Sequence, residues 1–232
     1  MDKEISYLYR IEYDDGTVQT FDICLHALTL DNNLESGPAP DWARRGAFGC
    51  VNPSCPLRPD ETCPFARIVH YLLTLFDNVR STQMAEVSVR TQHRTTTKRV
   101  ALQSVVGSLA GILMSTCGCP VLARFKPMVR FHLPFASLEE TEYRAFTMYA
   151  LAQFLRGRRH LSRDDGLDGL RRFYNEVQAL NRLAAAKISA LQKMDATING
   201  LVILDTFASS VTFSLDDNDL DHMEHIFSDW LK

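Results

Sequence analysis

Alternation of apolar and polar residues near the start of the chain predicts antiparallel β-strands. Residues 5–13 are rich in β-branched and aromatic side chains, and residues 17–25 continue the pattern. Between them Asp15 and Gly16 form a turn signal, because glycine tolerates the positive φ that tight hairpins require. A further alternating stretch at 86–92 is expected to add a strand. The N-terminal part is therefore predicted to be a small antiparallel sheet of about three strands.

The later part of the chain has the period of α-helices, with apolar residues recurring every three or four positions. Ser137 and Glu140 form a capping-box signature at the start of one helix. In another helix Gly107 and Gly111 would let a second backbone approach closely. Helices are predicted at 64–76, 100–114, 137–155, 165–194, 195–208 and 217–231. The last of them is expected to bury Leu220, Met223, Phe227 and Trp230.

These patterns place the chain in the α+β class, with a small sheet followed by a helical C-terminal half. We expect a single domain over 1–232. Residues 1–99 would hold the sheet, a cysteine- and proline-rich loop and one helix, and residues 100–232 would form the helical part. The loop at 29–63 carries five of the nine prolines, and a loop of this length is usually functional or tied down.

The most regular periodicity lies between residues 165 and 194, where apolar positions alternate spacings of three and four. This seam has two interpretations. It packs inside the chain as one helix of a bundle, or it forms a dimerising coiled coil in which Asn181 fixes the register. Another protein or a second copy of the chain is thus a candidate partner. The seam consists of Leu167, Leu170, Tyr174, Val177, Asn181, Ala184, Ile188 and Leu191.

Composition narrows the function classes. The formal net charge is -3, so the bulk field does not attract polyanions, and nucleic acid is not an expected partner. The most apolar long stretch, 100–114, is shorter than the roughly 20 residues of a membrane-spanning helix. The N-terminus has no apolar signal core. We therefore expect a cytoplasmic protein without a membrane span.

Cysteines followed by proline are the strongest chemical signal. Cys55, Cys63 and Cys119 each precede a proline, and Cys117 stands two residues before Cys119. Proline stiffens the backbone beside each sulfur, and such turns suit soft-metal sites, in which thiolates converge on one ion. Cys55, Cys63, Cys117 and Cys119 are accordingly predicted to bind zinc or an iron–sulfur cluster.

Alternatives to this ligand set stay open. Cys50, His70 or His132 would replace Cys117 if Cys117 does not bind the metal. Without a metal, the cysteines would be reduced thiols in proline-rich turns, since free cysteine is commonly buried as a small apolar residue. A redox disulfide is the third interpretation.

A second candidate site surrounds the run 128–135. Pro127 and Pro134 are expected to bracket an extended segment that carries Arg130 and His132. Together with Glu140 these residues are candidates for binding a ligand, because arginine and histidine bind anions and transfer protons. The alternative is a buried ion pair with a hydrogen-bonded core histidine.

The Cys-Pro pairs, the run MVRFHLPF at 128–135 and the run LVILDTFA at 201–208 resemble a bacterial family of unknown function over essentially the whole chain. The resemblance implies a single bacterial cytoplasmic module and no reaction type. No P-loop, dinucleotide fingerprint, H-E-x-x-H motif or nucleophile elbow is present, so no catalytic residue is assigned.

Two functions follow from these signals. The first is a sensing or protein-interaction module with a cysteine-ligated centre. The second is a metal- or cluster-dependent enzyme with a pocket near Arg130 and His132.

Overall fold

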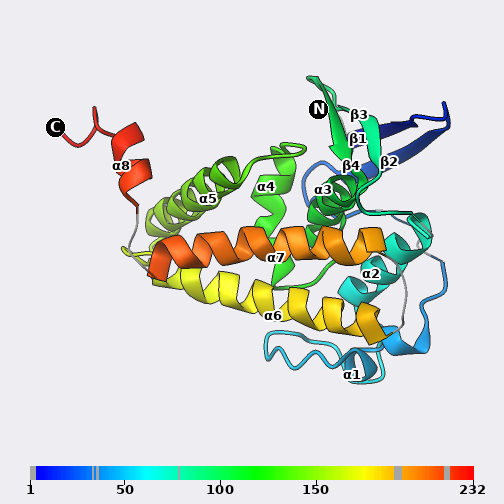
Figure 1. Cartoon of the computed structure of the whole chain (residues 1–232). Helices are drawn as coiled ribbons and strands as arrows, with labels where there is room; N and C mark the ends of the chain where they lie inside the picture. The colour runs from blue at the N-terminus through cyan, green and yellow to red at the C-terminus, as the bar shows by residue number, and fades with distance from the viewer. Residues whose placement is uncertain (1–3, 33, 35–36, 78, 191–194, 217–219) are drawn as a thin grey trace. The chain divides into compact units, whose positions relative to one another are not determined.

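The structure, a computed structural model, describes the chain except for residues 1–3, 33, 35–36, 78, 191–194 and 217–219 (Figure 1). It has the predicted α+β architecture, with four antiparallel strands in the N-terminal half and mostly helices after them. The chain divides into two compact units. The first unit is Met1–Phe135 with Leu180–Leu204, and the second is Ala136–Ala179 with Asp205–Lys232.

The first unit contains a sheet with the strand order β2-β1-β3-β4. The predicted hairpin is confirmed as β1 (Glu4–Tyr13) and β2 (Val18–His26), and the predicted third strand as β3 (Met84–Arg90). The alternation of apolar and polar residues that predicted these strands also determines which side chains lie on the buried face of the sheet. In β1 the side chains of Tyr7, Tyr9 and Ile11 are buried, because side chains two positions apart point to the same face.

The fourth strand, β4 (Thr95–Ala101), was not predicted. It pairs with β3 at the edge of the sheet and is largely exposed. Its sequence begins with three threonines and two basic residues, so it lacks the apolar alternation that marks a half-buried strand. Pairing of its backbone with β3 places it in the sheet.

Two helices supply much of the core of the first unit. Pro64 is the first residue of α2 (Pro64–Leu75), as predicted, because a proline there has no N–H to leave unsatisfied. The helix α3 (Leu102–Ser115) begins directly after β4 and buries residues on nearly every side. The largest fully buried side chains of these helices are Phe65, Leu72, Leu102, Leu109, Ile112 and Leu113.

Glycine allows α3 to approach the first part of α7 (Asp195–Asp216) closely. A Cβ on Gly107 would lie 3.5 Å from the carbonyl oxygen of Gly200, and a Cβ on Gly200 would lie 2.7 Å from Cγ1 of Val106. A Cβ at position 107 would thus be in ordinary van der Waals contact, and the glycine that this approach requires is Gly200. At Gly111, by contrast, an added Cβ would meet no atom within 4 Å, so Gly111 does not serve a close approach.

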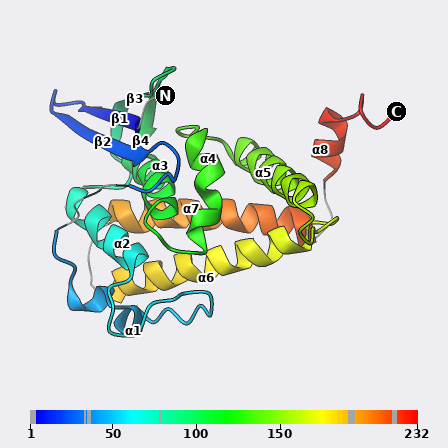
Figure 2. The same cartoon turned by 180° about the vertical axis from the view of Figure 1, so that it is seen from behind.

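Short elements hold the cysteine-rich loop. The 3-10 turn η1 (Asp41–Ala43) and α1 (Arg45–Phe48) lie between β2 and α2. In both views α1 lies beside the C-terminal end of α6 (Asp168–Ala190) (Figures 1 and 2), and Lys187 of α6 donates to the carbonyl of Ala47 at 2.8 Å. After α3, the turn η2 (Leu122–Phe125) leads into α4 (Lys126–Arg130).

The second unit begins with α5 (Leu138–Arg158). Ser137 accepts from the backbone of Glu140, and the Glu140 carboxylate accepts from the backbone of Ser137, so the predicted capping box is confirmed. Within this unit Glu142 is a buried carboxylate of α5. It accepts hydrogen bonds from the hydroxyls of Ser210 and Ser214 on α7, and its Oε2 lies 3.4 Å from Nε2 of His222.

The predicted seam lies on α6, which crosses from the second unit to the first. Its members Leu170, Tyr174, Val177, Ala184 and Ile188 are buried, as is Asn181. Leu191 lies outside the described residues. The chain's own side chains thus cover this face of α6.

Residues 217–219 of the predicted last helix lie outside the described residues, and in the described part the helix is shorter than predicted and differently buried. It is α8 (Asp221–Ile226), and Met223 is its buried residue. Phe227 and Trp230, which were predicted to face inward, are exposed. The prediction was wrong because α8 ends before Phe227, so the helical spacing that would align these two residues with Met223 does not continue.

By length and composition α7 could cross a membrane. Its segment Ala196–Leu215 has a mean hydropathy of 1.4, and 39% of that segment is buried. The core helix of a water-soluble protein has the same properties, and in the first unit α7 packs with Gly200 against Val106 of α3.

Candidate functional site

Four cysteines line one small cavity in the first unit. Cys50, Cys55 and Cys63 come from the loop before α2, and Cys119 comes from the segment after α3. The cavity has a volume of about 70 Å³. Its other lining residues are mostly apolar and include Leu57, Phe65, Val121, Leu180 and the three prolines Pro56, Pro64 and Pro120. Sulfur is therefore the principal chemical feature of this cavity.

Cys63 sits at the N-terminal end of α2. It is the residue before the helix, and Pro64 is the first residue within it. Burial raises the pKa of the Cys63 thiol to about 11, and the backbone N–H groups of Ala66 and Phe65 act in the opposite direction. Those N–H groups have no carbonyl partner within the helix and favour a negative sulfur. The site thus combines a desolvated thiol with dipoles that stabilise its thiolate.

Cys119 has the same local arrangement. Its carbonyl oxygen accepts from the backbone N–H of Ala123 at 2.9 Å, which begins a helical turn. Burial raises the pKa of the Cys119 thiol, and the backbone N–H groups of Leu122 and Val121 lower it. Each of these Cys-Pro pairs therefore places a sulfur where a helical turn begins.

The loop that carries Cys50 and Cys55 is tied to α1. The guanidinium of Arg45 donates to the carbonyls of Leu57 at 2.7 Å and Asn52 at 3.3 Å. The backbone N–H of Gly46 donates to the carbonyl of Pro59 at 2.9 Å. The loop at 49–63 is consequently ordered by backbone acceptors, although it has almost no regular secondary structure.

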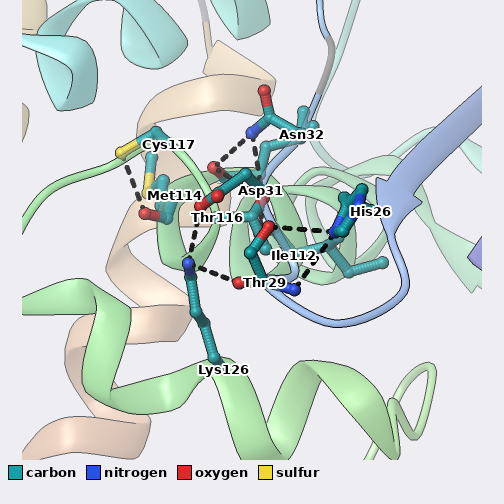
Figure 3. Close-up of polar contacts among 10 residues, drawn as sticks. His26, Thr29, Asp31, Asn32, Ile112, Met114, Thr116, Cys117 and Lys126 are labelled. Carbon is teal, nitrogen blue, oxygen red and sulfur yellow. Dashed lines mark hydrogen bonds and ion pairs between the residues drawn. The ribbon is translucent and has the colours of Figure 1, made fainter. Parts of the chain in front are cut away.

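Cys117 does not line this cavity. Its Sγ donates to the carbonyl of Met114 at 3.0 Å, as Figure 3 shows. Burial of the sulfur raises the pKa of the Cys117 thiol to about 12. Three of the four predicted ligands are therefore brought to one cavity, and Cys50, the first of the alternatives to Cys117, is the fourth cysteine there.

All six cysteines are free thiols in the structure. Among the residues that the structure describes, no three His, Cys, Asp or Glu side chains stand in position to hold a metal ion together. His70, another alternative ligand, does not line the cavity, and its ring packs edge-on against Trp42 with the ring centres 5.9 Å apart.

A polar network positions the segment that leads to Cys119 (Figure 3). Nδ2 of Asn32 donates to the hydroxyl of Thr116, the residue directly after α3, at 2.9 Å. Lys126 at the start of α4 donates to the carboxylate of Asp31 at 2.6 Å and to the carbonyl of Thr29 at 2.7 Å. The hydrogen bond from Lys126 also holds the pKa of Asp31 below its usual value. These contacts fix both ends of the 117–125 segment to the strand-end loop.

The second predicted site is arranged differently from the prediction. Residues 126–130 form the helix α4, so the extended run across 128–135 was wrong. The proline at position 127 is in the first turn of that helix, where proline is tolerated. Arg130 is exposed at the end of α4, and Glu140 caps α5 in the second unit.

His132 belongs to a partly buried hydrogen-bond network. Its Nε2 lies 2.7 Å from the hydroxyl of Tyr9 and 3.2 Å from that of Ser108, and those two hydroxyls are 2.8 Å apart. The ring of Tyr7 meets the histidine edge-on. This is the core-histidine interpretation of the sequence pattern, and the network joins β1 to α3.

A family described as "Domain of unknown function (DUF6901)" matches residues 7–228. The chain belongs to the DUF6901 family. No curated protein and no solved structure matches the chain.

The range that matches DUF6901 includes every cysteine that lines the cavity. The family description assigns no activity, so the residues of this DUF6901 chain are the source for its chemistry. Sequence reasoning missed the network of Tyr9 and Ser108. The signal for Tyr9 is its place in the alternation of β1, whereas nothing in the sequence pairs Ser108 with it.

Proposed function

We propose that the chain is a sensing or protein-interaction module built around a cysteine-ligated zinc centre. The thiolates of Cys50, Cys55, Cys63 and Cys119 would bind the ion. One observation carries the proposal: four cysteines from two segments more than fifty residues apart line the same small cavity. The ligand set differs from the one predicted from sequence, because Cys50 takes the place of Cys117.

The sulfur chemistry supports this centre. Zinc prefers thiolate ligands at about 2.3 Å and binds four of them in closed structural sites. Each sulfur position depends on a single side-chain torsion, χ1, so rotation about that bond is the movement that would bring the sulfurs toward a common centre. Metal binding displaces the thiol protons. The helix-start N–H groups beside Cys63 and Cys119 favour the resulting thiolates.

The size of the cavity favours one ion over a cluster. A volume of about 70 Å³ corresponds to a few water molecules, and a single zinc ion needs less room than a multi-iron cluster. A reducing compartment such as the cytoplasm would keep the thiols available.

The enzyme alternative has less support. Four cysteine ligands leave no open position for a substrate. Arg130 and His132 do not line the cavity, and His132 is engaged by Tyr9 and Ser108. A closed centre would connect the loop at 49–63 to the start of α2 and to the segment after α3. Such a centre suits a sensing or interaction module in which metal binding fixes the conformation of the loop.

The test is metal analysis of protein purified under reducing conditions, followed by titration with Zn²⁺. We expect about one zinc per chain. Serine in place of Cys50, Cys55, Cys63 or Cys119 should weaken zinc binding at least about tenfold, because each removes one of four thiolates. Cys117→Ser is the matched control, since it removes a neighbouring buried thiol outside the cavity, and it should retain full binding.

Two results would contradict the proposal. One is folded wild-type protein with six reduced thiols that takes up no zinc even when Zn²⁺ is in excess. The other is zinc affinity that Cys63→Ser and Cys119→Ser leave unchanged while circular dichroism shows both variants folded. A coloured protein containing iron would keep the ligand set and replace zinc by a cluster.

A further inference from the structure

The second half of α5 exposes apolar side chains where a surface helix normally carries polar ones. Leu151 is 56% exposed and Phe154 is 61% exposed. They lie on one helical face with Leu155 and Arg158, because the four positions follow the spacing i, i+3, i+4, i+7. The buried residues of α5 are Glu142 and Ala145, both in its first half. The second half thus presents an apolar stripe to the outside.

This stripe is basic at its end. Four arginines follow or accompany it, and acidic residues begin only with Asp164. Arg163 forms an ion pair with Asp165 at 2.7 Å, whereas Arg158 and Arg159 are exposed beside the stripe. We call this surface the α5 face; it consists of Leu151, Phe154, Leu155, Arg158 and Arg159.

The C-terminal segment, 220–232, has the opposite charge and the same apolar character. Trp230 is 85% exposed, and Ile226 and Leu231 are exposed beside it. Asp221, Glu224 and Asp229 are exposed on the same segment. Asp229 forms an ion pair with Lys232, and the two other carboxylates leave acidic groups next to large apolar side chains. Exposed apolar surface of this kind marks interaction sites, and tryptophan is enriched at the centres of interfaces.

We propose that two copies of the chain associate through these surfaces, with the C-terminal segment of each copy on the α5 face of the other. Charge complementarity selects the second copy as the occupant, because the chain itself carries both an arginine-rich apolar face and an acidic apolar segment. A two-fold axis makes each contact occur twice. The contact would bury Trp230 against Phe154 and pair Glu224 and Asp229 with the arginines of the α5 face.

The first experiment measures mass by sedimentation equilibrium up to a concentration of about 100 µM. We expect a concentration-dependent dimer. Phe154→Ser and Trp230→Ala should each weaken it at least about tenfold, because each removes a large apolar contact. Val51→Ser is the matched control: Val51 is 89% exposed in the first unit, and its loss should leave the dimer unchanged.

A charge exchange gives the decisive result. Arg158→Glu/Arg159→Glu makes both surfaces of one variant acidic, and Glu224→Lys/Asp229→Lys makes both surfaces of another basic. Each variant alone should be monomeric, because its two surfaces repel each other. Mixed in equal amounts they should form a heterodimer, because both contacts are then complementary.

Several outcomes would overturn the proposal. They are a wild-type chain that stays monomeric at every concentration, a mixture of the two charge variants that stays monomeric, or a dimer that Phe154→Ser does not weaken. Flotation with anionic phospholipid vesicles, lost in Phe154→Ser and seen without any dimer, would assign the α5 face to a lipid surface instead. Circular dichroism of each variant separates lost association from lost folding.

Discussion

Cys63 and Cys117 show how burial and local dipoles compete at a single sulfur. Burial raises the pKa of both thiols, to about 11 and about 12. Cys63 also faces the first N–H groups of α2, which favour its thiolate. Cys117 also meets backbone N–H groups, those of Cys119 and of Cys117 itself. In addition it donates its S–H to the carbonyl of Met114, an arrangement that requires the proton. Burial outweighs the N–H groups at both sulfurs, and at Cys117 the hydrogen bond to Met114 stabilises the thiol further.

The raised pKa of Cys117 predicts a pH effect on the metal-free protein. The ordinary pKa of the thiol is 9.0, and in the folded chain it is about 12. Between these values the unfolded chain loses a proton that the folded chain keeps, so the free energy of unfolding falls as the pH rises above 9. Serine does not ionise in this range. The stability of Cys117→Ser relative to wild type should thus rise by about 1 kcal/mol per pH unit between roughly pH 9.5 and 11.

Urea denaturation of both proteins at several pH values measures this difference, and the other titrating groups cancel between them. A difference that stays constant with pH would show that the sulfur of Cys117 is not desolvated in the folded chain. Below pH 9 the two curves should run parallel, because the thiol is protonated in both the folded and the unfolded chain.

At the level of single residues the sequence predicted part of the cavity. Proline after Cys55, Cys63 and Cys119 marks these three cysteines, since it restricts the backbone beside each sulfur. Cys50 and Cys117 carry no such mark in the sequence. Which of them lines the cavity depends on the turn after α3 and on the ties between Arg45 and its loop, and these are tertiary contacts.

The packing of α3 against α7 in the first unit can be tested with a single substitution at Gly200. Gly200→Ala places a Cβ 2.7 and 2.8 Å from Cγ1 and Cβ of Val106, and a Cβ held by the backbone of α3 cannot turn away. We expect a loss of about 1–3 kcal/mol in the free energy of unfolding, the usual cost of overpacking. Chemical denaturation measures it.

The matched control is Gly111→Ala in the interior of α3. No atom lies within 4 Å of the added Cβ there, and alanine is a better helix former than glycine, so this variant should gain roughly 0.5–1 kcal/mol. Equal effects of the two substitutions would mean that α3 and α7 do not pack as described.

Elements with a strong local signal were predicted well. The hairpin of β1 and β2, the proline start of α2 and the capping box of α5 are each specified by neighbouring residues. Elements decided by tertiary contacts were missed. Polar β4 is a strand because β3 offers it backbone partners. The run at 128–135 begins as a helix although Pro127 precedes it and Pro134 lies within it. The short α8 ends before the residues expected to align on its buried face.

On the scale of the whole molecule, two compact units share two continuous helices. The boundary between the units crosses α6 between Ala179 and Leu180, and it crosses α7 between Leu204 and Asp205. Helix formation is cooperative, because each turn provides the hydrogen-bond acceptors of the next. Unfolding of one unit would leave half of each helix without the packing that stabilises it.

We therefore predict that the two units unfold in a single transition. The chain has two tryptophans: Trp42 lies in η1 of the first unit, and Trp230 lies in the second. In Trp230→Phe, fluorescence reports only the first unit, whereas helical circular dichroism also follows α5 and the second-unit parts of α6 and α7. The two probes should give the same urea midpoint. Midpoints that differ by more than about 0.5 M urea would mean that the shared helices do not couple the units. The same measurement in saturating zinc is a second test. If zinc binds to the folded first unit, both urea midpoints should rise together. A ligand that binds only the folded state stabilises all the structure that unfolds in the same transition.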